Sequence, residues 1–322
     1  MKKWVIMLLC LIAAISLSAC GSNNQTNAQT SKPADSSSSV GTADQTSTLD
    51  SSKLQVSVTF DAMKEFVKAV GQDKVEISTI IPDGTEPHDF EPKAQDLVGL
   101  STAQVFVYNG LGMEAWVEKA VSAANNTNLV TIEASNGADA IENADPGEIE
   151  EHGQFDPHLW ISLKGAELEV KNIKDGLIQA DPYNKDFYET NCDDFVTQLE
   201  SLYNEYNEKF QSVEKKSFVT GHAAFGYLCR DFGLEQNSVE DVFAEGEPTA
   251  QQLSELVKYC KANNVTTIFA EEMASPDVSQ TLANEVGAKV ETIYTIESAE
   301  DGMTYLERMQ SSLAIIYESL TK

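Results

Sequence analysis

The sequence predicts an α/β protein with two lobes, each built on a parallel β-sheet, and a single long helix that joins them. Short apolar segments alternate twice over with helical patterns of about ten residues, which is typical of parallel βαβ units. Between these two series, residues 182–212 contain no glycine and no proline after Pro182. We therefore expect an N-terminal lobe at 54–181, a linking helix at 182–212 and a C-terminal lobe at 213–322.

The first series begins with alternating apolar and polar residues at 54–60, the period of a strand, and Asp61 is placed to cap the helix that follows. The same alternation of strand and helix patterns continues to residue 132. Predicted strands follow at 74–81, 104–108 and 129–132, and predicted helices lie at 61–70, 92–101 and 113–123.

The second series carries clearer signals at its helix starts. The stretch from Thr249 to Gln252 has the pattern of a capping box, and Ser275 with Pro276 fits an N-cap followed by the first helical position. Predicted strands lie at 217–220, 234–239, 265–270 and 288–294, and predicted helices lie at 223–231, 250–262, after 276 and at 305–320.

The linking helix has one apolar stripe and a defined start. Asp181 is placed to cap it, and Pro182 suits the first helical position. The stripe consists of Phe195, Leu199, Leu202, Tyr206 and Phe210. A helix that packs against both lobes would act as a rigid connection, so we expect little hinge motion.

The N-terminal residues predict export and a lipid anchor. Two lysines precede an apolar run that is short for a bilayer span, as in a signal peptide at 1–19. Cys20 follows Leu-Ser-Ala and resembles the lipidated cysteine of a bacterial lipobox. Residues 21–53 are polar and predict a disordered tether with a reach of about 30 Å. We expect an extracytoplasmic protein anchored by lipid to the outer face of the cell membrane.

Charge and cysteine content exclude several classes of protein. Removal of residues 1–19 takes away Lys2 and Lys3 but no acid, which leaves 20 basic against 51 acidic residues and a charge of −31. Such a surface repels phosphate backbones, so no nucleic-acid partner is expected. Cys192, Cys229 and Cys260 show no CxxC spacing, and we expect buried thiols rather than a disulfide framework.

Three of the four histidines follow predicted strands. His88 lies in Glu-Pro-His-Asp-Phe-Glu-Pro, His158 in Asp-Pro-His-Leu-Trp, and His222 in Gly-His-Ala-Ala-Phe-Gly-Tyr. In open α/β sheets, ligands bind beyond the carboxyl ends of the strands, where loops distant in sequence converge. Imidazole is a common zinc ligand, so the pattern predicts a metal site.

A tetrahedral site needs a fourth donor. Glu297 directly follows the last predicted strand and is the best candidate by position, while Glu300 and Asp301 remain alternatives. Each half of the chain would then supply two ligands, and the site would lie in the cleft between the lobes. Asp89 and Asp156 are candidates to orient the ligating imidazoles, because such rings usually donate their other N–H to a carboxylate.

These motifs, with Asn-Gly-Leu-Gly-Met-Glu at 109–114, resemble the zinc/manganese class of bacterial solute-binding lipoproteins over residues 54–320. The resemblance implies two lobes joined by a backbone helix and delivery of metal to the permease of an ABC importer. It also implies His88, His158, His222 and Glu297 as ligands. Manganese-type members tend to have Glu and Asp at the last two positions, and imidazole suits zinc better than Mn²⁺. We therefore expect Zn²⁺ as the transported ligand, Mn²⁺ as the alternative, and a monomer.

The stretch 139–156 departs from the His-rich loop of many zinc-type members. It holds seven acids, no lysine or arginine, and only one histidine, His152. The candidate secondary metal loop consists of Glu148, Glu150, Glu151 and His152. A mobile acidic surface loop is the competing interpretation. If the loop speeds capture by concentrating cations, deletion of 142–152 should slow zinc association at low salt.

Three other functions compete with a receptor. Residues 110–115 match a permissive dinucleotide-binding pattern, but they follow the third predicted strand rather than the first. A zinc hydrolase would need an open coordination position, with Glu86 or Glu91 as its base, if Glu297 does not bind. No HExxH or nucleophile elbow is present, so we expect no enzyme. A surface adhesin or scaffold also fits a tethered acidic globule.

Overall fold

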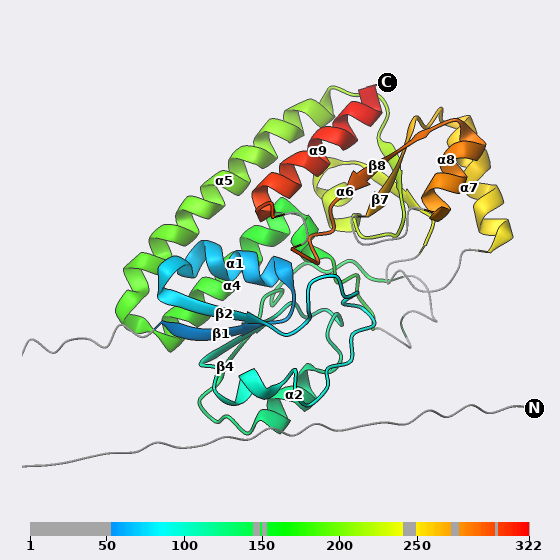
Figure 1. Cartoon of the computed structure of the whole chain (residues 1–322). Coiled ribbons are helices and arrows are strands. Elements are labelled where there is room, and N and C mark those ends of the chain that lie inside the picture. The colour runs from blue at the N-terminus through cyan, green and yellow to red at the C-terminus, as the bar shows by residue number, and fades with distance from the viewer. Residues whose placement is uncertain are drawn as a thin grey trace, which may run out of the picture. The chain divides into compact units, whose positions relative to one another are not determined.

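Two four-stranded parallel sheets form the framework, in agreement with the predicted α/β architecture (Figure 1). The structure is a computed structural model that describes residues 53–143, 149, 153–240, 249–271, 277–299 and 302–321. The first sheet has the order β2-β1-β3-β4 and the second the order β6-β5-β7-β8. The strands are β1 Leu54–Val58, β2 Val75–Thr79, β3 Val105–Tyr108, β4 Val130–Glu133, β5 Ser217–Thr220, β6 Glu235–Ser238, β7 Thr267–Glu271 and β8 Lys289–Ile293.

Helices connect these strands and cover the sheets. The α-helices are α1 Asp61–Gly71, α2 Val117–Ala124, α4 Leu163–Ala180, α5 Lys185–Gln211, α6 Gly226–Phe232, α7 Ala250–Ala262, α8 Asp277–Val286 and α9 Tyr305–Thr321. Single 3₁₀ turns are η1 Gln72–Lys74, η2 Val98–Ser101, η3 Leu159–Ile161 and η4 Pro182–Asn184. The predicted capping box forms at the start of α7, where Thr249 and Gln252 bond to each other's backbone N–H groups. Ser275 and Pro276 lie outside the described residues.

Sequence patterns missed or misplaced several helices. The predicted helix at 92–101 is only the turn η2, which buries Leu100 alone and so has no apolar stripe to pack. Both α2 and α6 begin a few residues later than predicted, after turns. Helix α4 was not predicted, although Ser162 caps it by accepting a hydrogen bond from the Gly165 N–H.

The linking helix begins as a 3₁₀ turn rather than with an Asp181 cap. The Asp181 carboxylate instead accepts hydrogen bonds from Asn184 and Tyr188 side chains, at 2.5 and 2.8 Å. Helix α5 then packs against α1 and α4 beside the first sheet and against α6 and α9 beside the second (Figure 1). A rigid connection between the halves was the role expected of this helix.

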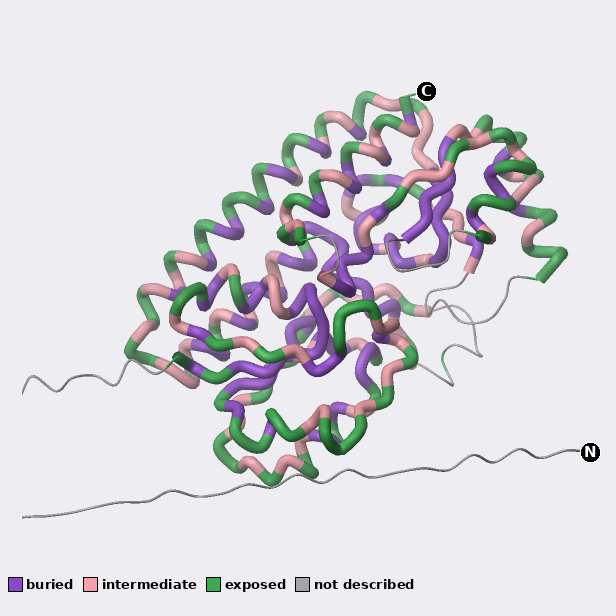
Figure 2. The backbone as a smooth tube through the Cα atoms, viewed as in Figure 1, coloured by how far each residue is buried: buried purple, intermediate pink, exposed green. Residues whose placement is uncertain are grey.

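One hydrophobic core runs through both halves. It contains strand residues such as Val56 and Val107 from the first sheet, Phe218 and Phe269 from the second, and the stripe of α5. Figure 2 shows buried segments, in purple, in both halves and in the region where they meet. Residues 51–322 cluster as one compact unit. The predicted division into an N-terminal lobe at 54–181, a linking helix at 182–212 and a C-terminal lobe at 213–322 therefore stays a proposal.

The three cysteines among the described residues, Cys192, Cys229 and Cys260, are buried free thiols, as expected. Burial raises the pKa of Cys192 and of Cys260 to about 11, and it raises the pKa of Cys229 still further. These thiols are thus poor nucleophiles and poor metal ligands near neutral pH. Among the described residues, no helix combines the length and the apolar character needed to cross a bilayer.

The turn after β3 fixes one loop beside the sheet edge. Gly110 and Gly112 have φ of +93° and +95°, which favours glycine at both positions. The buried Glu114 carboxylate accepts hydrogen bonds from the N–H groups of Asn109 and Gly110 and from the Thr59 hydroxyl. The Asn109 side chain donates to the Pro157 carbonyl at 2.9 Å. This glycine pattern therefore builds a tight turn that supports the neighbouring loop.

Burial of Glu114 predicts a pH-dependent stability of the metal-free protein. Desolvation raises the pKa of Glu114 to about 7, against the opposing effect of its hydrogen bonds. The folded state therefore holds this proton more tightly than the unfolded chain. The proton on Glu114 therefore stabilises the folded state. This contribution to the free energy of unfolding is fully present below pH 4.5 and is lost as the pH rises through 7, a total change of about 3 kcal/mol.

Glu114→Gln removes this titration. The substitution lowers the free energy of unfolding by the same amount at every pH. Between pH 5 and pH 8 only wild type also loses the contribution of Glu114, so the variant's free energy of unfolding should rise by about 2–3 kcal/mol relative to that of wild type. Urea denaturation of both metal-free proteins across this range measures the difference. Parallel pH profiles would show that Glu114 titrates normally in the folded state.

Candidate metal centre

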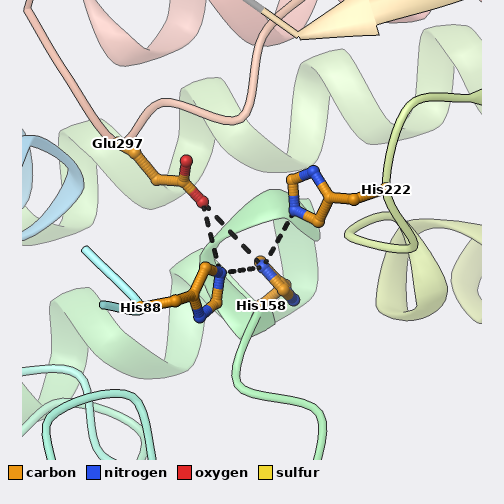
Figure 3. A group of neighbouring side chains, drawn as sticks. All are labelled: His88, His158, His222 and Glu297. Carbon is orange, nitrogen blue, oxygen red and sulfur yellow. Dashed lines mark hydrogen bonds and ion pairs between the residues drawn. The ribbon is translucent and has the colours of Figure 1, made fainter. Parts of the chain in front are cut away.

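Four of the predicted site residues come together between the carboxyl ends of the two sheets (Figure 3). His88 lies in the loop after β2, and His158 lies in the segment between β4 and α4. His222 follows β5, and Glu297 follows β8. Each half of the chain therefore contributes two of the four side chains. The other proposed fourth donors, Glu300 and Asp301, lie outside the described residues.

The distances between these side chains match the size of one coordination sphere. Nε2 of His158 lies 3.1 Å from Nε2 of His88 and 3.4 Å from Nε2 of His222. A zinc–nitrogen distance near 2.05 Å gives a tetrahedral edge of about 3.3 Å. Glu297 Oε1 lies 3.9 Å from Nε2 of both His88 and His158, and all four donor atoms lie within 4.8 Å of one another.

The cluster is almost fully withdrawn from solvent. His158, His222 and Glu297 are buried residues, and the His88 side chain is only 1% exposed. Burial lowers the pKa of His222 well below its ordinary value of 6.5, and the positive charge of a protonated His158 would lower it further. His222 is therefore neutral near pH 7, which is the form that binds a metal.

Asp156 orients His158. Its Oδ1 atom lies 2.9 Å from Nδ1 of the ring and accepts the His158 backbone N–H at 2.9 Å. An ionised carboxylate only accepts hydrogen bonds, so Nδ1 carries the ring proton and Nε2 presents its lone pair to the cluster. The Tyr227 hydroxyl donates to the Asp156 carbonyl at 2.6 Å and fixes this loop from α6. Asp89 is exposed and shows no such contact.

Glu271 was not identified from the sequence. It ends β7, and its Oε1 accepts the His222 backbone N–H at 3.0 Å and lies 3.7 Å from the ring Nδ1. A side chain on Gly221 would collide with this carboxylate, because an added Cβ would lie 2.0 Å from Glu271 Oε2. The sequence did contain a sign of this role. Glu271 is an acid at the carboxyl end of a buried strand, and such a position lies at the same edge of the sheet as His222.

Other predicted sites lie where the structure gives no description. These are the lipidation site Cys20 and the acidic loop residues Glu148, Glu150, Glu151 and His152.

Comparison with known proteins identifies the family to which most of the chain belongs. Residues 56–319 match the family described as zinc-uptake complex component A, periplasmic. The high-affinity zinc uptake system protein ZnuA of Bacillus subtilis (strain 168) is 35% identical over 335 residues, covering 99% of this chain and 98% of that protein. A protein of Treponema pallidum (strain Nichols) is 43% identical over 278 residues, covering 84% of this chain and 88% of that protein.

Solved structures agree in fold. A zinc-bound ZnuA with residues 138–173 deleted has a TM-score of 0.74 and 30% identity, covering 84% of this chain and 98% of that one. The laminin-binding protein of Streptococcus agalactiae, described as bifunctional with adhesin and metal transporting activity, has a TM-score of 0.76 and 33% identity. That match covers 84% of this chain and 100% of the other. By these matches, the chain belongs to the family of the periplasmic component A of zinc-uptake complexes.

Proposed function

We propose that this protein captures Zn²⁺ outside the membrane and delivers it to the permease of an ABC importer. His88, His158, His222 and Glu297 are its ligands. The observation that carries the proposal is the approach of three imidazole Nε2 atoms and one carboxylate oxygen to within 4.8 Å, from loops of both halves. The B. subtilis relative, which aligns over 99% of this chain, is named for zinc uptake.

The donor set favours zinc over manganese. Three imidazoles with one carboxylate suit Zn²⁺, whereas Mn²⁺ prefers carboxylate, carbonyl and water oxygens. The spacing of about 3.3 Å expected between tetrahedral donors is close to the observed 3.1 and 3.4 Å between imidazole nitrogens.

A closed coordination sphere also separates a receptor from a hydrolase. Catalytic zinc sites keep one position for water or substrate, while four protein ligands fill a tetrahedron. Glu297 Oε1 lies 3.9 Å from Nε2 of both His88 and His158, so its carboxylate is the fourth donor beside the imidazoles. The site is thus suited to holding and transferring an ion rather than to activating water.

The sequence and the names of the relatives support a proposal about localisation and partners. We propose that residues 1–19 are removed, that Cys20 carries the lipid and that residues 21–53 tether the body to the outer face of the cell membrane. The AdcA protein of Streptococcus pneumoniae, 34% identical over 279 residues, is named a zinc-binding lipoprotein, although this chain covers only 56% of it. A monomer in contact with the permease is the expected working unit.

Removal of one ligand tests the proposal directly. His222→Ala should raise the Kd for Zn²⁺ by more than about 100-fold, because loss of a ligand exceeds the 10–100-fold effect of losing a group that orients one. Wild type should bind one equivalent in a competition titration with a chromophoric chelator. Glu200→Ala, an exposed residue of α5, is the control and should bind like wild type. Equal affinity of His222→Ala and wild type would refute the ligand assignment.

Removal of the orienting carboxylate should have a smaller effect. Asp156→Ala frees the His158 ring to rotate and to change tautomer, so we expect a Kd for Zn²⁺ about 10–100-fold above wild type, with stoichiometry kept at one. Asp139→Ala, whose carboxylate is fully exposed, is the matched control and should bind like wild type. A wild-type Kd for Asp156→Ala would mean that packing alone orients the ring.

The low pKa of His222 predicts limited competition between zinc and protons. At pH 6 an ordinary imidazole is about three-quarters protonated, so three of them would release about two protons on zinc binding. Because His222 is already neutral, we expect fewer than about 1.5 from the imidazoles. Calorimetric titration in buffers of different ionisation enthalpy counts the protons. Release of two or more would contradict the neutral state of His222.

A further inference from the structure

One of the two arginines in the sequence is buried beside the loop that carries Glu297. Arg308 lies in the first turn of α9, and its side chain and that of Asp61 are each 1% exposed. Nη2 of Arg308 donates to Asp61 Oδ2 at 2.6 Å. Asp61 is the first residue of α1, so this ion pair joins a helix of the second half to a helix of the first.

The remaining guanidinium donors bind the backbone of the Glu297 loop. Nη1 donates to the Ser298 carbonyl at 2.8 Å, on the residue directly after Glu297. Nη2 and Nε donate to the Met303 carbonyl at 2.9 and 3.2 Å. One planar group therefore holds the acid of α1 and two carbonyls of the loop in a fixed relation, which the single ammonium of a lysine does not reproduce.

Residues of the first half also bind this loop directly. The Glu297 carbonyl accepts from the Asp61 N–H at 3.4 Å, and the Trp160 indole donates to the Thr295 carbonyl at 2.7 Å. The Ser298 hydroxyl accepts from the N–H of Gly84, at 2.8 Å. Gly84 precedes His88 in the same loop, so the bonds around Arg308 connect segments on both sides of the metal cluster.

Stability alone is a weak reason for this arrangement. Desolvation of a buried ion pair costs about as much free energy as the mutual attraction returns, and an apolar pair of similar volume often stabilises a fold equally well. What the guanidinium adds is geometry, because its rigid fork fixes two carbonyls and a carboxylate at once. The peptide after Glu297 is one of the groups that it fixes.

We propose that Arg308, paired with Asp61, is a positioning residue for the metal site: it holds the loop so that the Glu297 carboxylate stays within reach of the ion. The inference rests on the proposed coordination by Glu297 and adds a residue remote from the metal that sets the fourth ligand. Arg308 acts on zinc binding through Glu297 and not through the three histidines.

A double-mutant cycle separates this role from general support of the fold. The variants are Arg308→Lys, Glu297→Ala and the two combined, and Arg230→Lys is the matched control. Arg230 also donates to a backbone carbonyl, that of Asp139 at 2.6 Å, but has no contact with the Glu297 loop among the described residues. The measurements are the Kd for Zn²⁺ and the visible spectrum of the Co²⁺ form, whose intensity distinguishes four-coordinate from higher-coordinate ions. Thermal denaturation of each metal-free variant reports its fold.

We expect Arg308→Lys to raise the Kd for Zn²⁺ about tenfold and to shift the Co²⁺ spectrum toward that of Glu297→Ala. In the Glu297→Ala background, Arg308→Lys should change the Kd less than about twofold, because the ligand it positions is already absent. Arg230→Lys should match wild type in both measurements. If Arg308→Lys does not fold, Asp61→Asn replaces it in the same cycle with the same expectations.

Two outcomes would overturn the role of Arg308. In the first, the folded variant keeps the wild-type Kd and Co²⁺ spectrum. In the second, it weakens binding by the same factor with and without Glu297, which is the result of general loosening of the fold. A wild-type Kd for Glu297→Ala alone would instead refute the proposed ligand set, and with it any role of Arg308 through that ligand.

Discussion

The packing of both sheets against one continuous core is the constraint on which the metal cluster depends. Helix α5 contacts helices beside each sheet, and the core it belongs to includes residues of both, such as Val107 and Phe269. This packing sets the carboxyl ends of the two sheets opposite each other. Loops from distant parts of the chain then meet there, as loops meet at the carboxyl ends of strands in a single open sheet. Without a shared core, the two pairs of side chains in the cluster would belong to separate bodies, and the distance between the pairs would not be fixed.

Burial gives the cluster its chemistry. Imidazoles this close together would repel one another if protonated, and withdrawal from water opposes protonation further, as the lowered pKa of His222 shows. His222 therefore presents a neutral nitrogen donor at neutral pH. The same low polarity raises the pKa of Glu114 beneath the neighbouring turn. Desolvation thus acts in opposite directions on bases and acids, and in both cases it favours the uncharged form.

Three side chains of the cluster, His158, His222 and Glu297, are held by contacts outside it. The Asp156 carboxylate selects the tautomer of His158, and Glu271 holds the backbone of His222. Around Glu297, residues of the first half bind the loop that the second half supplies, and Arg308 bonds to both. A metal site formed on loops needs such supports. Without them, the side-chain positions would vary by more than the narrow range of distances that metal coordination allows.

By itself the sequence determined the two βα series, the long helix and the residue types that gather at the site, because periodicity and strand-end loops are local patterns. It also indicated Asp156, which lies two residues from His158. It did not reveal α4, the late start of α6, or the parts played by Glu271 and Arg308. Those residues act across 49 and 247 positions of sequence, on His222 and Asp61 respectively. Only tertiary packing decided these partners, because the orientation of a buried carboxylate or guanidinium depends on which distant backbone groups the fold brings within hydrogen-bonding distance.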